Sequence, residues 1–278
     1  MPMYEHLRVS LREWTLPPLL EPLRDKRQKR HAYLLKTLCK RINFTYRNQN
    51  FVYFPITTMK NTIVGEIGKR TISTLSHGPD ENFAPKKEPT WELANFFMDI
   101  SEGQTEQVAT LQNNPKLGSP KKIIEALFKE LEKSEKPFKA DIEYVVSSNK
   151  FWSTVKENQG NISEASFSFV PPNMFGGRDA FSRDMQRLRD DVGSEETKLV
   201  TKNQQKLLKL EDKRFKEIID YALDGGGEVK LKSSNKTIFS SSKGRKTSEI
   251  KDSLPLSHTK EHDRNSIIRN LIKEFFNK

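Results

Sequence analysis

Hydrophobic residues fall into short runs of strand character through the first half of the chain. Residues 24–41 are an exception, because a basic run there is followed by Tyr and Leu residues at helical spacing, which predicts a helix. Aromatic and β-branched runs predict strands at 42–46, 51–56, 61–67, 94–100 and 107–112. Residues 76–90, rich in Pro, Gly and Lys, are predicted to be a loop.

Helix and strand patterns alternate in the second half. Ser119 and Pro120 are typical of a helix start, with Ser as the N-cap and Pro at the first helical position. The later elements are predicted as strand 138–146, helix 149–157, strand 162–170, helix 179–192, strand 197–202, helix 211–223, and strands 228–231 and 237–240. Antiparallel strands followed by β-α-β units predict an α+β fold, and 119–205 is compatible with a ferredoxin-like sandwich.

The pattern divides the chain into four segments. They are an apolar and then basic N-terminal segment, 1–41; an α+β body, 42–240; a Ser-, Lys- and Thr-rich linker, 241–265; and a C-terminal amphipathic helix, 266–278. Residues 1–23 are too apolar for a free tail, and residues 266–276 carry an apolar stripe. We expect both to dock, either on the body or on a partner protein.

Composition narrows the class of protein. The net charge of +11, from 48 Lys and Arg against 37 Asp and Glu, favours an acidic partner such as nucleic acid. The single cysteine, Cys39, excludes an intrachain disulfide and a cysteine cluster for zinc. With neither a signal peptide nor a long apolar run, we expect a cytoplasmic protein without a membrane span.

The basic excess is concentrated in two segments. Residues 24–47 hold nine Lys and Arg against one Asp, and residues 229–251 hold seven against one Glu. The predicted nucleic-acid contacts are Arg24, Lys26, Arg27, Lys29, Arg30, Lys40, Arg41, Arg47, Lys230, Lys232, Lys243, Arg245 and Lys246. Nearby aromatic rings could stack on unpaired bases: Tyr33, Phe44, Tyr46, Phe51 and Phe239. The alternative to nucleic-acid binding is that the first basic segment is the solvated face of a helix and the second is part of a linker.

A second candidate site is Glu228-Val-Lys230, after a predicted helix that carries Asp220 and is followed by Asp224. Metal-dependent nucleases place carboxylates and a lysine in this way, so that the carboxylates hold Mg²⁺. Glu-x-Lys also occurs at Glu196, Glu211 and Glu249, however, so we favour a strand with alternating surface charges as the explanation of the motif. Mg²⁺ is predicted as a cofactor only if the protein is such a nuclease, and no other cofactor is predicted.

Two further motifs carry weaker signals. His258 and His262 would share a face of a helix and could bind zinc, but they lie in a polar segment without a third ligand at a useful spacing. Residues 171–179 pass from Pro-Pro through a Gly pair to the start of a predicted helix, where free N–H groups and Arg178 could bind an anion. The structural alternative is a tight turn with Asp179 as the N-cap, and no metal site is predicted.

Three stretches, 95–120, 167–179 and 221–242, resemble an uncharacterised group of stand-alone prokaryotic proteins, some of which lie near phage-defence genes. The resemblance implies a defence or mobile-element context but no reaction and no site residues. We therefore predict a non-enzymatic nucleic-acid-binding or complex-forming component. The alternatives are a metal-dependent nuclease and a protein-interaction subunit of a larger complex, so enzymatic activity stays open.

Overall fold

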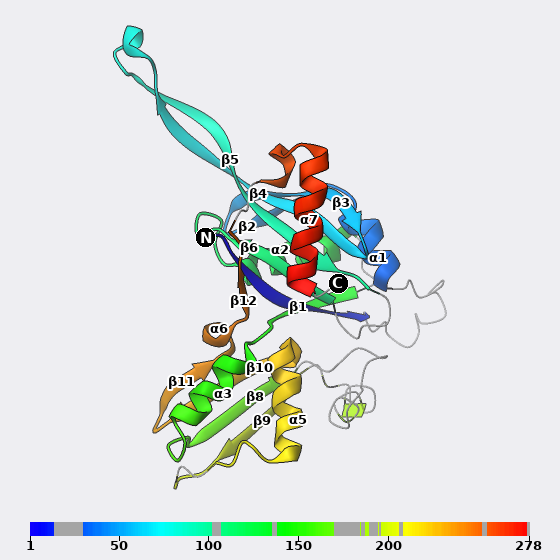
Figure 1. The fold of residues 1–278 in the computed structure, drawn as a ribbon, viewed down its shortest axis with the longest axis vertical. Coiled ribbons are helices and arrows are strands. Elements are labelled where there is room, and N and C mark those ends of the chain that lie inside the picture. Colours follow the sequence, from blue (N-terminus) through cyan, green and yellow to red (C-terminus); the bar gives the residue numbers. More distant parts are fainter. Residues whose placement is uncertain are drawn as a thin grey trace.

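The molecule consists of two antiparallel β-sheets with helices packed on them, and a two-stranded arm projects from the larger sheet (Figure 1). The computed structural model describes residues 1–13, 30–101, 107–134, 138–169, 196–205, 208–251 and 255–276, together with residues 184, 187, 188 and 194. The helix predicted at 179–192 therefore lies almost entirely outside the described residues.

The larger sheet contains eight described strands in the order β12-β1-β6-β5-β4-β3-β2, with β7 also paired to β1. Their bounds are β1 Met3–Glu13, β2 Ile42–Tyr46, β3 Gln49–Met59, β4 Thr62–Ser76, β5 Pro85–Asp99, β6 Gln107–Asn113, β7 Phe138–Tyr144 and β12 Thr247–Glu249. Neighbouring strands are antiparallel throughout. The strands predicted at 94–100 and 107–112 are confirmed as parts of β5 and β6, which pair with each other.

The predicted fold of β-α-β units, with a ferredoxin-like option, is wrong. β6 and β7 flank helix α2 (Pro120–Ser134) in sequence, yet they do not pair with each other, because β1 lies between them and is antiparallel to both. In the smaller sheet β8 pairs directly and antiparallel with β9 and with β10. The sequence pattern does not predict β1, the strand that separates β6 from β7.

The larger sheet has a different cover on each face. On one face, α1 (Arg30–Leu38) and α2 pack on a core that includes Phe51, Tyr53 and Phe96. α2 contacts both β2 and β7, which lie near opposite ends of the strand order, so the sheet curls around α2 as a half-barrel. On the other face, α7 (Glu261–Phe276) buries Ile268, Leu271, Ile272 and Phe275 against Tyr4, Val64 and Phe97.

The smaller sheet lies below the larger one in Figure 1, in the order β11-β10-β8-β9. Its strands are β8 Glu164–Phe169, β9 Thr197–Lys202, β10 Gly227–Ser233 and β11 Lys236–Ser240. Helices α3 (Ser148–Glu157) and α5 (Lys213–Tyr221) cover one face, where Phe151, Phe167 and Ile219 are fully buried. The opposite face carries the polar residues of the same strands, as the alternating burial of β8 and β10 requires.

Arg8 of β1 joins the two sheets. Its side chain is 4% exposed, its guanidinium lies 5.1 Å from the ring centroid of Tyr221, and Nη1 donates to the carbonyl oxygen of Asp224 at 3.3 Å. Asp224 belongs to η3 (Ala222–Gly226), a π-helical turn in which Gly225 has φ 86°. A Cβ on Gly225 would lie 2.6 Å from Cβ of Arg8, so only glycine fits there.

Two segments contain more secondary structure than the sequence predicted. The predicted loop 76–90 is strand from Pro85 onward, with the short 3₁₀ turn η2 (Pro79–Glu81) at its tip. The segment 241–265, predicted to be a linker, holds α6 (Ser241–Gly244), β12 and η4 (Leu256–His258), and α7 begins within it at Glu261.

Candidate functional site

The two basic segments do not form one surface. The described part of the first covers α1, β2 and the turn after it, at one edge of the larger sheet. The second runs through β10 and β11 of the smaller sheet to β12, at the opposite end of the larger sheet's strand order. Arg24, Lys26, Arg27 and Lys29 lie outside the described residues.

Carboxylates already pair with much of the second segment. Lys230 Nζ lies 2.9 Å from Glu228, Lys232 Nζ lies 2.9 Å from Glu164, and Arg245 Nε lies 2.9 Å from Glu5. Burial raises the pKa of Glu5, and the charge of Arg245 acts against that rise. Paired cations release fewer counterions to a polyanion, so this segment offers less to nucleic acid than its composition indicates.

The aromatic rings proposed for base stacking pack inside the protein. Tyr33, Phe44, Phe51 and Phe239 are each at most 3% exposed and belong to hydrophobic cores. Tyr46 is partly buried against the same core as Phe51. These rings stabilise the fold and cannot stack on a ligand without unfolding part of it.

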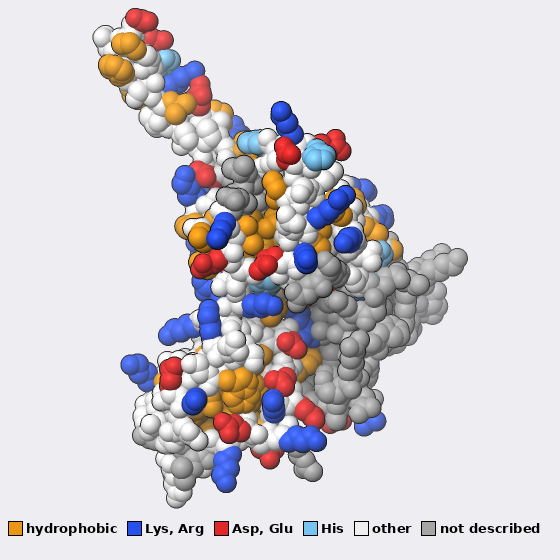
Figure 2. All heavy atoms as spheres, viewed as in Figure 1, with side chains coloured by type: hydrophobic (Ala, Val, Ile, Leu, Met, Phe, Trp, Pro, Cys, Tyr) orange, Lys and Arg blue, Asp and Glu red, His pale blue; other side chains and the backbone are white. Residues whose placement is uncertain are grey.

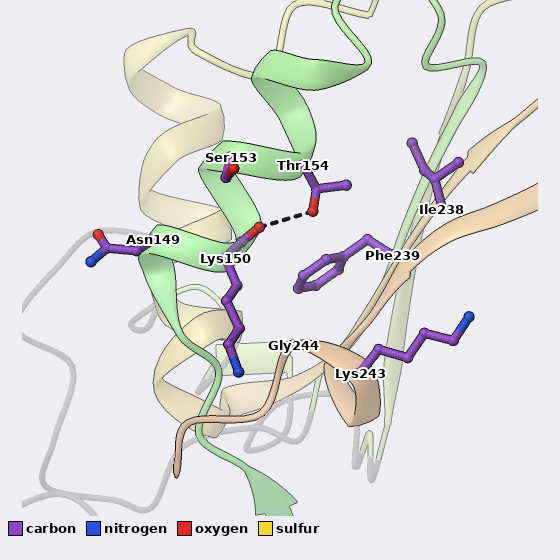
Figure 3. Close-up of a pocket in the computed structure, with 8 residues that line it drawn as sticks. All are labelled: Asn149, Lys150, Ser153, Thr154, Ile238, Phe239, Lys243 and Gly244. Atoms are coloured by element: carbon purple, nitrogen blue, oxygen red, sulfur yellow. Dashed lines mark hydrogen bonds between the residues drawn. The ribbon is translucent and has the colours of Figure 1, made fainter. Parts of the chain in front are cut away.

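A shallow hollow lies between α3 and β11, with a volume of about 530 Å³ (Figure 3). Its lining is Asn149, Lys150, Ser153, Thr154, Ile238, Phe239, Lys243 and Gly244. The side chains of Lys150 and Lys243 point in different directions, so the two ammonium groups do not converge on one position. The hollow is a basic depression without a point at which several donors meet.

The residues of the nuclease hypothesis are not brought together on one side of the sheet. Glu228 and Lys230 pair with each other on the polar face of β10, whereas α5, which carries Asp220, packs on the opposite face through Ile219. Asp224 lies in the turn beside Arg8. Among the described residues, no group of three or more His, Cys, Asp or Glu side chains is arranged to hold a metal ion.

Only one of the two weaker motifs lies within the described residues. His258 ends η4 and His262 lies in the first turn of α7, where its side chain is fully exposed and lies 3.6 Å from the Asp263 carboxylate. Residues 171–179, with Arg178 and Asp179, lie outside the described residues.

The two apolar terminal segments are packed on the larger sheet. Leu7, Val9 and Leu11 of β1 are at most 1% exposed, and the apolar stripe of α7 covers the opposite face. Residues 14–23 lie outside the described residues. Apart from Met1 and Met3, which are exposed, the described apolar side chains named above are occupied by contacts within the molecule.

The projecting arm is the outer part of β4 and β5, residues 70–91, and it differs from the rest of the sheet. β3 pairs with β4 only as far as Lys69, and β6 pairs with β5 only at 96–98, so the arm is a ribbon of two strands. Five of the large hydrophobic side chains that are exposed lie on β3, on the arm or at its tip: Phe54, Ile72, Leu75, Phe83 and Trp91. Hydrophobic side chains are visible along the arm in Figure 2.

The two faces of the arm have different compositions. Thr71, Ser73, Glu88 and Thr90 are partly buried on one face, where the hydroxyl groups of Thr71 and Ser73 each lie 3.0 Å from that of Thr90. We call this the polar face. The register places the alternate cross-strand pairs on the opposite side, which we call the apolar face: Arg70 with Trp91, Ile72 with Pro89, and Thr74 with Lys87. Leu75, opposite Lys86, follows the polar face. All six side chains of the apolar face are exposed.

The apolar face continues into a groove at the base of the arm. The groove has a volume of about 260 Å³ and is lined by Arg41, Val52, Phe54, Glu66, Gly68, Trp91, Leu93 and Ser257. Trp91 lies against Gly68, since a Cβ there would be 3.2 Å from the indole ring. Groove and arm thus form one apolar surface along three strands.

Charge is distributed unevenly over the two faces. On the polar face, Lys86 pairs with Glu88, and Glu92 pairs with Lys116 at 2.7 Å. On the apolar face and around the groove, Arg41, Arg70 and Lys87 have no ion-pair partner among the described residues. The carboxylate there, Glu66, is 2% exposed and accepts the backbone N–H of Ser257. Three cations without an ion-pair partner in the described part of the chain thus rim the apolar surface.

Comparisons of this chain with protein-family models, curated proteins and solved structures found no match. The resemblance to prokaryotic proteins near defence genes therefore stays a prediction. In the described part of the chain, none of the helices has both the length and the apolar character needed to cross a membrane.

Proposed function

We propose that the protein is a complex-forming component that binds a partner protein through the projecting β4–β5 arm. The observation that carries the proposal is the exposed apolar face of a ribbon with only two strands. Such a ribbon is marginally stable alone in water, and a contiguous exposed apolar surface is typical of an interaction site.

The alternating pattern favours a partner over chance exposure. A ribbon that functioned only as a solvated projection would carry polar residues on both faces. Here the polar face is the less exposed of the two, while Ile72 is 72% and Trp91 is 47% exposed. A few side chains near the centre of a patch contribute most of the binding energy at protein interfaces, and tryptophan is enriched among them.

The arm's net charge favours a protein over nucleic acid as its partner. Between Gly68 and Glu92 the chain holds four Lys or Arg and four Asp or Glu, so the segment lacks the basic excess of a polyanion-binding element.

The test compares matched variants of the tagged full-length chain, recovered with bound proteins from cells that carry its gene. Replacing Ile72 and Trp91 by Thr should remove a specific partner, whereas replacing Thr71 and Ser73 of the polar face by Ala should retain it. A partner retained equally by both variants, or by neither, contradicts the proposal. Circular dichroism of both variants confirms that the body is intact.

Nucleic-acid binding remains a second proposal, favoured by the net charge of +11 and the hollow beside α3. It predicts affinity for DNA or RNA that falls steeply between about 50 and 200 mM salt. Replacing Lys150 and Lys243 by Gln should weaken that binding, and the loss of Ile72 and Trp91 should not. Unchanged affinity in the lysine variant would contradict the assignment to the hollow.

A further inference from the structure

We infer that the partner of the arm is an apolar segment flanked by Asp and Glu residues, belonging to a different protein. This inference rests on the proposed function and adds the partner's chemistry. It is argued from the three cations at the rim of the apolar face and the groove, Arg41, Arg70 and Lys87.

The cations around the apolar face indicate which charges its partner must carry. Arg41, Arg70 and Lys87 surround the apolar centre formed by Phe54, Trp91 and the side chains between them. A partner that covered this centre would partly desolvate these three cations. Desolvated charges without counter-charges weaken an interface, so carboxylates on the partner are needed at the rim.

The same charges argue against a second copy of this chain. Two arms packed by their apolar faces about a two-fold axis would place two sets of Arg41, Arg70 and Lys87 around one interface. None of the six side chains on each apolar face is a carboxylate that could offset them, and the exposed Asp80 and Glu81 lie at the tip of the arm. Like charges brought together in this way oppose association.

The charges of the arm argue against a nucleic-acid strand as its partner as well. Residues 68–92 hold as many acidic as basic side chains, so the arm lacks the basic excess that is typical of a polyanion-binding element. Ile72 and Pro89 in the middle of the surface have no aromatic ring on which a base could stack.

The test selects random 16-residue peptides displayed on phage for binding to the full-length chain, after removal of those that bind the Ile72→Thr, Trp91→Thr variant. We expect the surviving peptides to be enriched in large apolar residues and in Asp and Glu over Lys and Arg. A synthetic survivor should bind the Arg70→Glu, Lys87→Glu variant about tenfold or more weakly. Replacing Lys36 and Lys129 by Glu, on helices of the opposite face of the sheet, is the matched control.

The results of this selection distinguish a failure of the acidic partner from a failure of the arm as a docking element. Survivors enriched in Lys and Arg, or survivors indifferent to the charge reversal, overturn the acidic partner and leave the arm as a docking element. A selection without any peptide that depends on Ile72 and Trp91 counts against the proposed function itself.

Two direct measurements test whether a second copy of this chain or a nucleic-acid strand binds to the arm instead. A concentration-dependent dimer in sedimentation that is lost on Ile72→Thr overturns the inference in favour of self-association. Quenching of Trp91 fluorescence by oligo-dT or oligo-U, absent in Trp91→Phe, overturns it in favour of a nucleic-acid strand.

Discussion

The inner and outer parts of one β-hairpin behave as two different structures. Within the body, β4 and β5 bury Val64, Ile67, Phe96 and Phe97 completely, because α1 and α2 cover one face and α7 the other. Beyond Lys69 the same two strands continue, and no third strand pairs with either of them in the described part of the chain. Pairing of the backbone is thus sufficient to continue a strand, whereas stability depends on what covers its faces.

The largest expected effect is in the inner part. Phe97→Ala should lower the free energy of unfolding by about 3–5 kcal/mol, because Phe97 is fully buried and its ring packs 5.2 Å from that of Phe275. Ile72→Ala in the arm should change it by less than about 0.5 kcal/mol. Urea unfolding of both variants measures the difference. Similar costs at the two positions would remove the distinction between body and arm.

A pH titration should give an intermediate effect that belongs to the body alone. Burial, and then the charge of Lys246, lower the pKa of His6 to about 4 from 6.5. The unfolded chain therefore binds a proton more readily, and stability that is present above pH 6.5 is lost as the pH falls toward 4, by about 3 kcal/mol.

Urea unfolding at several pH values checks this expectation. His6 also lies 2.8 Å from the Ser248 hydroxyl, so His6→Gln keeps a hydrogen-bonding group while removing the titration. That variant should show a flatter pH dependence, and the control His262→Gln, at a fully exposed side chain, should not. An unchanged slope in His6→Gln would contradict the assignment to this histidine.

The smallest effect is expected when the arm is removed. Replacing residues 71–90 by Asn-Gly joins the cross-strand partners Arg70 and Trp91 through a two-residue turn. The free energy of unfolding should change by less than about 1 kcal/mol, since the removed part buries little surface. A larger loss in thermal or urea unfolding would show that the arm stabilises the body.

Local patterns predicted many individual elements well. The strand 42–46 and the helix from Pro120 are confirmed as β2 and α2, because alternation and capping are read from residues that are close in sequence. β1 was missed because its charged residues interrupt the apolar run. Glu5 and Arg8 are nevertheless buried, since Arg245 pairs with one and Tyr221 with the other.

The candidate surface was harder to predict. Residues 85–93 contain two prolines, two lysines and two glutamates, which are typical of a loop, yet they complete a strand by pairing with β4. The signal that could have found the arm was the alternation of Arg70, Ile72 and Thr74 with Thr71 and Ser73, matched by Trp91 and Pro89 on the return strand.

The sequence by itself determined where the chain forms helices and most strands, and how much charge it carries, because these properties depend on residue type and short-range order. Only the tertiary structure decided which strands are neighbours, which cations are already paired and which apolar side chains stay in water. Those outcomes depend on contacts between segments far apart in the chain, such as β1 with β12, and local patterns contain no record of them.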